Sequence, residues 1–251
     1  MSPLLAASDK SFWHGFAKFY EKHFPESVDG SILEFGVFKG NSIRWLLARF
    51  PNAKIVGADI LPVQPEWPID ERVTYVELDQ ADEGQIDSLV RSIDRVRMII
   101  EDGSHVPRHQ SNCLKHGLLA LQPGGIYVLE DIHTSHPAHS QYRDEFGPAH
   151  AQTALSVLLG IEQLKRQGNA PTEAQLNALA AGDHFSLLDV ETLVEQIDQI
   201  SVFKRATLPD SCWRCGSSTF DYHAFKCECG VDLMSEADSM TIVIRKSLDS
   251  V

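Results

Sequence analysis

Short apolar runs alternate with amphipathic stretches through the first half of the chain. The apolar runs fall at 31–35, 54–58, 73–78, 96–100 and 125–129. Segments with helical spacing of apolar residues separate them, at about 41–50, 83–92 and 107–121. Short strands that alternate with helices predict a parallel sheet covered on both faces. We therefore expect an α/β fold with a Rossmann-like, doubly wound sheet.

The two ends of the chain add elements around this pattern. Before it, residues 8–24 predict one amphipathic helix that Pro25 ends, so residues 1–30 form an N-terminal helical segment. After it, residues 136–147 predict a mobile polar loop. Helices are expected at about 150–167, 172–181 and 189–196.

Two further apolar segments, 200–205 and 240–245, predict an antiparallel pair that completes a seven-stranded sheet. Residues 206–239 lie between them and predict an insertion. Residues 31–251 are therefore interpreted as one domain that carries this insertion before its last strand.

A glycine-rich segment follows the first predicted strand and opens a helix. It runs from Leu33 to Ser42 with glycines at 36 and 40, which let the backbone approach a ligand closely. Asp59 ends the second strand, 23 residues after Gly36 and close to the usual spacing of about 20 in a nucleotide-binding unit. A carboxylate at this position can accept hydrogen bonds from both hydroxyls of a ribose.

This segment lacks the G-x-G-x-x-G pattern of dinucleotide sites. Its Glu-x-Gly-x-x-x-Gly pattern instead resembles the motif of class I methyltransferases, which use S-adenosylmethionine. The resemblance implies that Glu34 lies near the amino-acid end of the cofactor and that Asp59 holds the ribose. It also implies that Asp79 and Gln80, after the third strand, border the adenine, although both also fit an ordinary loop. The implied cofactor-binding set is Glu34, Gly36, Gly40, Ser42, Asp59, Asp79 and Gln80.

Acidic clusters end the fourth and fifth strands, at 101–105 and 130–133. Because the carboxyl ends of parallel strands open on one edge of the sheet, Asp102, Glu130 and Asp131 are expected to converge beside the cofactor. Three carboxylates suit magnesium, which prefers oxygen ligands. His105 is the predicted catalytic base, with Asp102 as its metal-binding partner in catalysis, and His133 is the alternative base.

The same segments carry a more specific resemblance. Asp-Gly-Ser-His at 102–105, Gln110 and the run from Leu121 to Ser135 resemble the metal-dependent sugar O-methyltransferases of macrolide biosynthesis. That resemblance implies magnesium on Asp102, Glu130 and Asp131. The chain departs from the family in two ways: it lacks the large N-terminal domain and it has a cysteine-containing insertion. These departures leave the acceptor open. Some relatives with the motif are named cephalosporin hydroxylases, so an oxidative role also stays open.

Four of the five cysteines fall in the predicted insertion. Cys212 and Cys215 form a C-x-x-C pair, and Cys227 and Cys229 form a C-x-C pair. Each pair precedes a glycine, which is typical of the tight backbone turn around a metal. Four thiolates predict a structural zinc site. Two disulfides are the alternative, and a redox C-x-x-C is a weaker one; neither a secretion signal nor an oxidising compartment is indicated.

Composition limits the choice of partner. With 35 acidic and 22 basic side chains, the formal net charge is −13, and no basic patch is concentrated locally, which disfavours a nucleic-acid partner. No membrane-spanning run is present, so the cytoplasm is the expected location, and a homo-oligomer stays possible.

The sequence thus predicts a metal-dependent O-methyltransferase that transfers the methyl group of S-adenosylmethionine to a hydroxyl of a sugar or small glycosylated acceptor. The alternatives are a methyltransferase acting on RNA or protein through the zinc module, and a non-catalytic nucleotide- or metal-binding protein.

Overall fold

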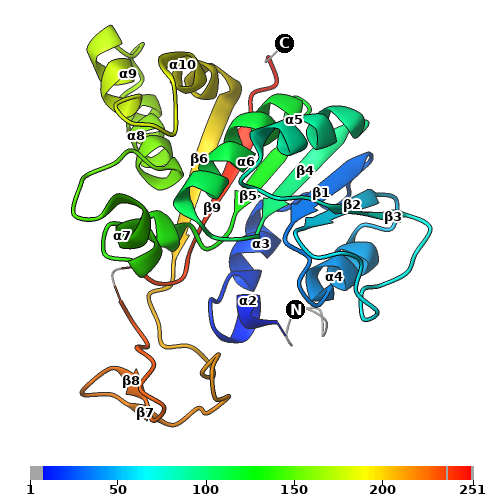
Figure 1. The fold of residues 1–251 in the computed structure, drawn as a ribbon, viewed down its shortest axis with the longest axis vertical. Helices are drawn as coiled ribbons and strands as arrows, with labels where there is room; N and C mark the ends of the chain where they lie inside the picture. The colour runs from blue at the N-terminus through cyan, green and yellow to red at the C-terminus, as the bar shows by residue number, and fades with distance from the viewer. Residues whose placement is uncertain (1–7, 236, 250–251) are drawn as a thin grey trace.

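The computed structural model describes residues 8–235 and 237–249. Within these residues one sheet has seven strands in the order β3-β2-β1-β4-β5-β9-β6 (Figure 1). Its parallel core consists of β1 Ser31–Phe35, β2 Lys54–Asp59, β3 Val73–Glu77, β4 Val96–Glu101 and β5 Ile126–Leu129. The strand β9 Met240–Lys246 is antiparallel to both β5 and β6 Ile197–Lys204. The predicted doubly wound sheet and its C-terminal antiparallel pair are confirmed.

Helices cover both faces of the sheet because side chains alternate between the two faces along each strand. Leu33, Ile99 and Tyr127 face one core, while Ile32, Met98 and Val128 face the other. The first core is covered by α5 Glu83–Ser92, α6 Pro107–Ala120, α8 Ala154–Gln167, α9 Glu173–Leu179 and α10 Leu187–Gln196. The second is covered by α3 Ala17–His23 and α4 Asn41–Arg49.

The winding of the sheet reverses between β1 and β4. These strands are neighbours in the sheet, although β2 and β3 separate them along the chain. The loops that leave their carboxyl ends diverge to opposite sides, and the crevice between such loops is where open α/β sheets bind ligands. The fold therefore places the glycine-rich loop after β1 beside the acidic segment after β4.

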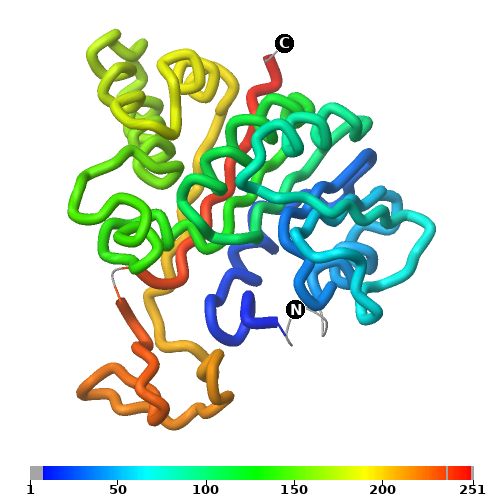
Figure 2. The backbone as a smooth tube through the Cα atoms, viewed as in Figure 1, coloured from blue at the N-terminus to red at the C-terminus, as the bar shows by residue number. Residues whose placement is uncertain are grey.

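The predicted N-terminal helix is two helices. α2 Asp9–Phe12 and α3 are separated by a bend at Gly15, whose φ of +74° lies in the left-handed region. Phe12, Phe16 and Phe19 keep helical spacing across the bend, which is why periodicity alone predicted one helix. The chain turns between the two helices (Figure 2). Phe16 packs in the core on one face of the sheet, whereas Lys10 of α2 contacts Asp102 and Glu130 after β4 and β5.

The segment predicted as a mobile loop is largely ordered. It contains α7 Ser140–Phe146, and just before it lies the short 3-10 helix η1 Ile132–Ser135. Tyr142 is buried, and its hydroxyl donates to the carbonyl of Ala149 and accepts from the amide of Ala151. A buried aromatic ring with a satisfied hydroxyl holds this segment together, and Glu145 ties it to α6 through Arg108, which the polar composition of the segment did not indicate.

The insertion leaves the sheet after β6 and returns at β9. It holds the small hairpin β7 Phe220–Asp221 and β8 Lys226–Cys227 and extends away from the sheet (Figure 1). We call residues 206–235 the cysteine module. Across the described parts of the chain, no helix has the length and apolarity needed to cross a lipid bilayer.

Candidate active site

A cavity of about 810 Å³ lies at the carboxyl ends of β1, β2, β4 and β5. This volume falls in the range of small-molecule pockets. The loop after β1 and Asp59 line one end, and Asp102, His105 and Asp131 line the other. Residues from α2 and from the cysteine module complete the wall. The predicted cofactor and catalytic regions therefore share one cavity.

The loop after β1 is shaped by its glycines and by Asp59. Gly36 has a φ of +91°, and a Cβ there would collide with the carbonyl oxygen of Asp102. The Asp59 Oδ2 accepts the amide N–H groups of Val37 at 2.7 Å and Phe38 at 3.0 Å. Gly40, with a φ of +71°, is the N-cap residue of α4, whose first residues Asn41 and Ser42 line the cavity. Asp59 thus fixes the loop as well as facing the cavity.

Glu34 lies behind this wall. It is fully buried in β1, it does not line the cavity, and neither carboxylate oxygen accepts a hydrogen bond within the described residues. Burial raises the pKa of Glu34 to about 7, against the opposing charge of Lys10. The expected position of Glu34 near the amino-acid end of the cofactor stays a prediction.

Gln80 and Asp79 have different surroundings. The Gln80 side chain accepts from the amide of Ser104 at 2.8 Å and donates to Glu101 Oε1 at 2.8 Å. It therefore holds the Asp-Gly-Ser-His loop in place while lining the cavity. Asp79 also lines the cavity, and its Oδ1 accepts the amide of Ala81 at 2.9 Å. The adenine-contacting role expected for both residues stays a prediction.

The acidic end brings together three of the predicted site residues. One ligand atom each from Asp102, His105 and Asp131 lie within 4.8 Å of one another. His105 Nε2 is 3.6 Å from Asp131 Oδ2 and 3.9 Å from Asp102 Oδ1. His105 and Asp131 both adopt positive φ, +58° and +47°. Residues other than glycine keep this conformation only where the surroundings enforce it, and such strain concentrates at functional sites.

Lys10 enters this cluster from α2. Its Nζ donates to Asp102 and, at 2.6 Å, to Glu130 Oε2, and both Lys10 and Glu130 are buried. Burial by itself lowers the pKa of Lys10, but the charges of Asp102 and Glu130 raise it well above its ordinary value. Lys10 is therefore a charged ammonium that pairs with Glu130, one of the three predicted magnesium ligands.

The remaining donors fit a divalent cation. Asp102 and Asp131 supply the carboxylate oxygens that magnesium prefers. The Asp131 Oδ1 is buried and accepts no hydrogen bond from the described residues, so it has capacity for a ligand. Glu130 also lines the cavity, and Lys10 Nζ donates to its Oε2 as it does to Asp102. The ligand roles of all three stay predictions.

The two candidate bases are distinguished by position. His105 lines the cavity, whereas His133 does not. His133 Nδ1 accepts the amide of Met240 at 3.4 Å, and burial lowers the pKa of His133 to about 4. His14 lies on the loop after α2 and lines the cavity as well. Its Nδ1 is 3.6 Å from Asp131 Oδ1.

Gln110 braces the loop that carries Asp131. This fully buried side chain donates to the Glu130 carbonyl at 3.3 Å and accepts from the Ser135 hydroxyl at 2.8 Å. Its place in the sequence motif is thus explained by a positioning role, with α6 holding the segment after β5.

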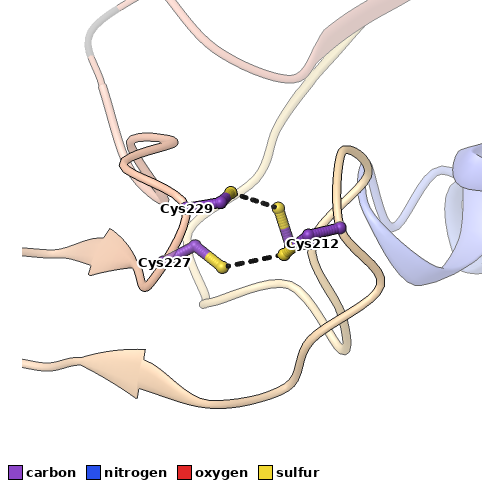
Figure 3. Close-up of side chains that lie close together, drawn as sticks. Cys212, Cys227 and Cys229 are labelled. Carbon is purple, nitrogen blue, oxygen red and sulfur yellow. Dashed lines mark hydrogen bonds between the residues drawn. The ribbon is translucent and has the colours of Figure 1, made fainter.

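The four cysteines of the module converge. Cys212 Sγ lies 3.6 Å from Cys229 Sγ, and Cys215 Sγ lies 3.4 Å from Cys227 Sγ (Figure 3). All four sulfur atoms lie within 4.8 Å of one another, and none is in a disulfide. Zn–S bonds of about 2.3 Å in a tetrahedron place sulfurs about 3.8 Å apart, whereas a disulfide needs about 2.05 Å. The predicted four-cysteine cluster before the last strand is confirmed.

Sequence reasoning missed several residues of the cavity wall, among them Lys10, Phe12, His14 and Trp213. The first three lie in a segment whose pattern indicated only an amphipathic helix. Trp213 lies between two predicted zinc ligands, and a large exposed aromatic residue inside a C-x-x-C turn was the signal available for it.

No family model matches the chain. Over 141 residues it is 31% identical to 8-demethyl-8-(2-methoxy-alpha-L-rhamnosyl)-tetracenomycin-C 3'-O-methyltransferase of Streptomyces olivaceus, a match covering 52% of this chain and 35% of that protein. Over 135 residues it is 30% identical to mycinamicin VI 2''-O-methyltransferase of Micromonospora griseorubida, covering 50% and 33%. The chain is related to these sugar O-methyltransferases. The resemblance predicted from its motifs is thereby confirmed, over about half of its length.

A solved structure shares the fold. The MycE methyltransferase of the mycinamicin pathway, in complex with magnesium and S-adenosylhomocysteine, aligns with a TM-score of 0.63 at 20% identity. The alignment covers 96% of this chain and 52% of that one. The chain thus has the fold of a class I methyltransferase and spans about half the length of MycE.

Proposed function

We propose that this protein is an S-adenosylmethionine-dependent O-methyltransferase that uses magnesium and acts on a hydroxyl of a sugar or small glycosylated acceptor. One observation carries the proposal: a single cavity joins the loop bound by Asp59 to the cluster of Asp102, His105 and Asp131. Relationship to sugar O-methyltransferases supports the choice of reaction and of acceptor class.

The cofactor is proposed to lie at the Asp59 end. Asp59 is proposed to accept a ribose hydroxyl through Oδ1, which accepts one backbone amide, that of Leu61, and keeps a lone pair, whereas Oδ2 already accepts the amides of Val37 and Phe38. The amino end of α4, with Asn41 and Ser42 in the wall, offers unpaired N–H groups for a carboxylate. S-adenosylmethionine, when bound, supplies an electrophilic methyl group.

The acceptor hydroxyl is proposed to be activated at the other end. Asp102 and Asp131 would hold magnesium, which when bound lowers the pKa of a hydroxyl. We propose His105, which lines the cavity beside both carboxylates, as the base that accepts the hydroxyl proton at Nε2.

The test of this function begins with binding. Titration calorimetry should show S-adenosylhomocysteine binding in the micromolar range, about −8 kcal/mol, and NAD binding far more weakly. A panel of rhamnosylated and other glycosides is then screened for S-adenosylhomocysteine formation. Chelation by EDTA should abolish turnover and magnesium should restore it. Equal affinity for NAD, or turnover unchanged in EDTA, would contradict the proposal.

The cysteine module is proposed to hold structural zinc. The sulfur separations described above support it, because they match a closed four-thiolate site. Elemental analysis of the purified protein should find about one zinc per chain, and Cys212→Ser or Cys227→Ser should remove it. Cys113→Ser is the matched control, since this cysteine is buried in α6 and should leave zinc bound. A zinc-free protein with four reactive thiols would refute the assignment.

A further inference from the structure

Trp213 reaches the active-site cavity from outside the sheet. It lies within the C-x-x-C turn between Cys212 and Cys215, its side chain is half-exposed, and it lines the cavity. Tyr222 and Phe225, the other large exposed aromatic residues of the module, do not line the cavity. The module thus contributes one specific ring to a site otherwise built by the sheet and α2.

The position of this ring is fixed by contacts between the module and α2. The carbonyl of Phe12 accepts the amide of Asp210 at 2.8 Å, two residues before Cys212. Trp13 packs in one buried cluster with Cys212 and Leu233. These contacts place the C-x-x-C turn directly against the end of α2.

Arg205 strengthens the same junction. Its guanidinium donates to the carbonyl of Trp13 at 2.9 Å and lies over the Trp13 ring at 4.6 Å. Arg205 is buried just before the module and pairs with Asp238 just after it. Since α2 also carries Lys10 into the acidic cluster, one short helix joins the module to the catalytic end of the cavity.

The geometry points to a new role for the module: we propose that Trp213 is an acceptor-binding residue that presents its indole to the apolar face of a neutral sugar ring. The inference rests on the proposed function and names the part of the chain that receives the acceptor. A metal-held turn would then set the position of a specificity-determining side chain.

The chemistry of the two ends of the cavity favours this occupant. The catalytic end presents carboxylates and His105, which suit hydroxyl groups. Trp213 and Phe12 add apolar surface to the same cavity, on the side of α2, whose Lys10 contacts those carboxylates. A sugar has hydroxyls on its rim and C–H groups on its faces, so it can satisfy both surfaces at once. The cofactor end has its own apolar side chains, Phe38, Ile60 and Leu61, close to Asp59, so Trp213 is not needed there.

Binding to p-nitrophenyl α-L-rhamnopyranoside tests the role without relying on turnover. With magnesium and S-adenosylhomocysteine saturating, Trp213→Ala should weaken rhamnoside binding about 10- to 100-fold, the range for removal of a tryptophan from a binding site. S-adenosylhomocysteine affinity and zinc content should match the wild type. Trp213→Phe should retain most of the affinity because it keeps an aromatic face.

Tyr222→Ala is the matched control, because Tyr222 is exposed on the same module but away from the cavity. In turnover assays Trp213→Ala should raise KM for the acceptor and leave kcat nearly unchanged. Should Trp213→Ala lose zinc, Trp213→Gln replaces it as the variant that keeps bulk at this exposed position.

The outcomes separate this inference from the proposed function. Loss of S-adenosylhomocysteine binding or of methyl transfer in the wild type would refute the proposed function. Intact methyl transfer with an unchanged KM in zinc-replete Trp213→Ala or Trp213→Gln would overturn the inference alone. Wild-type protein that binds S-adenosylhomocysteine but not the rhamnoside would also count against it.

Discussion

The two ends of the cavity are assembled in different ways. At the cofactor end, the loop after β1, the start of α4 and Asp59 all lie within one β-α-β unit, and Asp79 and Gln80 follow the next strand. The catalytic end draws on α2, on the segments after β4 and β5, and on the cysteine module. Lys10, for example, contacts Glu130 across 120 positions of sequence. Local sequence therefore specifies the first end, whereas the second requires the finished fold.

This difference has a consequence for what each substitution should disturb. Changes at the cofactor end should act on cofactor affinity through contacts made over a short stretch of chain. Changes at the catalytic end should act on turnover, metal response and stability together, because the same carboxylates take part in an ion pair, a metal site and proton transfer.

The largest expected effect concerns His105. His105→Ala should lower kcat about 10²- to 10⁴-fold, the usual contribution of a positioned base. Calorimetric affinity for S-adenosylhomocysteine should not change, since His105 lies at the opposite end of the cavity from Asp59.

His133→Asn is the matched control for that substitution, because an asparagine oxygen can replace Nδ1 as the acceptor of the Met240 amide. It should keep most activity. Full activity in His105→Ala would place the base elsewhere, and a collapse of kcat in His133→Asn would make His133 the next candidate.

Lys10→Met should lower stability by about 3 to 5 kcal/mol in EDTA, because it leaves Glu130 buried without its ammonium partner. Magnesium should then raise the Tm of the variant more than that of the wild type, since the metal takes over neutralisation of the carboxylates without competition from Lys10. Thermal denaturation with and without magnesium measures both effects.

Lys18→Met is the control for the lysine substitution, because Lys18 is exposed on α3. It should shift the Tm little in either condition. Equal stability of Lys10→Met and wild type in EDTA would argue that the buried ion pair contributes nothing to the fold.

The smallest expected effect lies at the cofactor end. Asp59→Ala should weaken S-adenosylhomocysteine binding about 10- to 150-fold, equivalent to about 1.5–3 kcal/mol for hydrogen bonds to a charged group. Calorimetry measures it directly, with Asp87→Ala on the exposed face of α5 as the control. An unchanged affinity would show that Asp59 only holds the loop after β1.

The features that the sequence predicted share one property. Each depends on residues that lie close together along the chain or on the regular geometry of a strand or helix. Alternating apolar residues specify strands and helices because each side chain's face follows from its position along the element. Gly36, Asp59 and the four cysteines likewise act within short stretches, so their spacing predicted the loop and the sulfur cluster. Asp102 and Asp131 were predictable together because parallel strands end at one edge of the sheet.

Other features were decided only by tertiary structure. The bend at Gly15 interrupts a helix whose aromatic spacing continues unbroken, and it turns Lys10 into the acidic cluster. The placement of His105 in the cavity wall and His133 outside it depends on how the loops after β4 and β5 fold over each other. Trp213 faces the cavity because α2 and the cysteine module pack together. These contacts join segments that are far apart in sequence. A local pattern of apolar residues cannot predict them, because they form only once the sheet has brought the segments together.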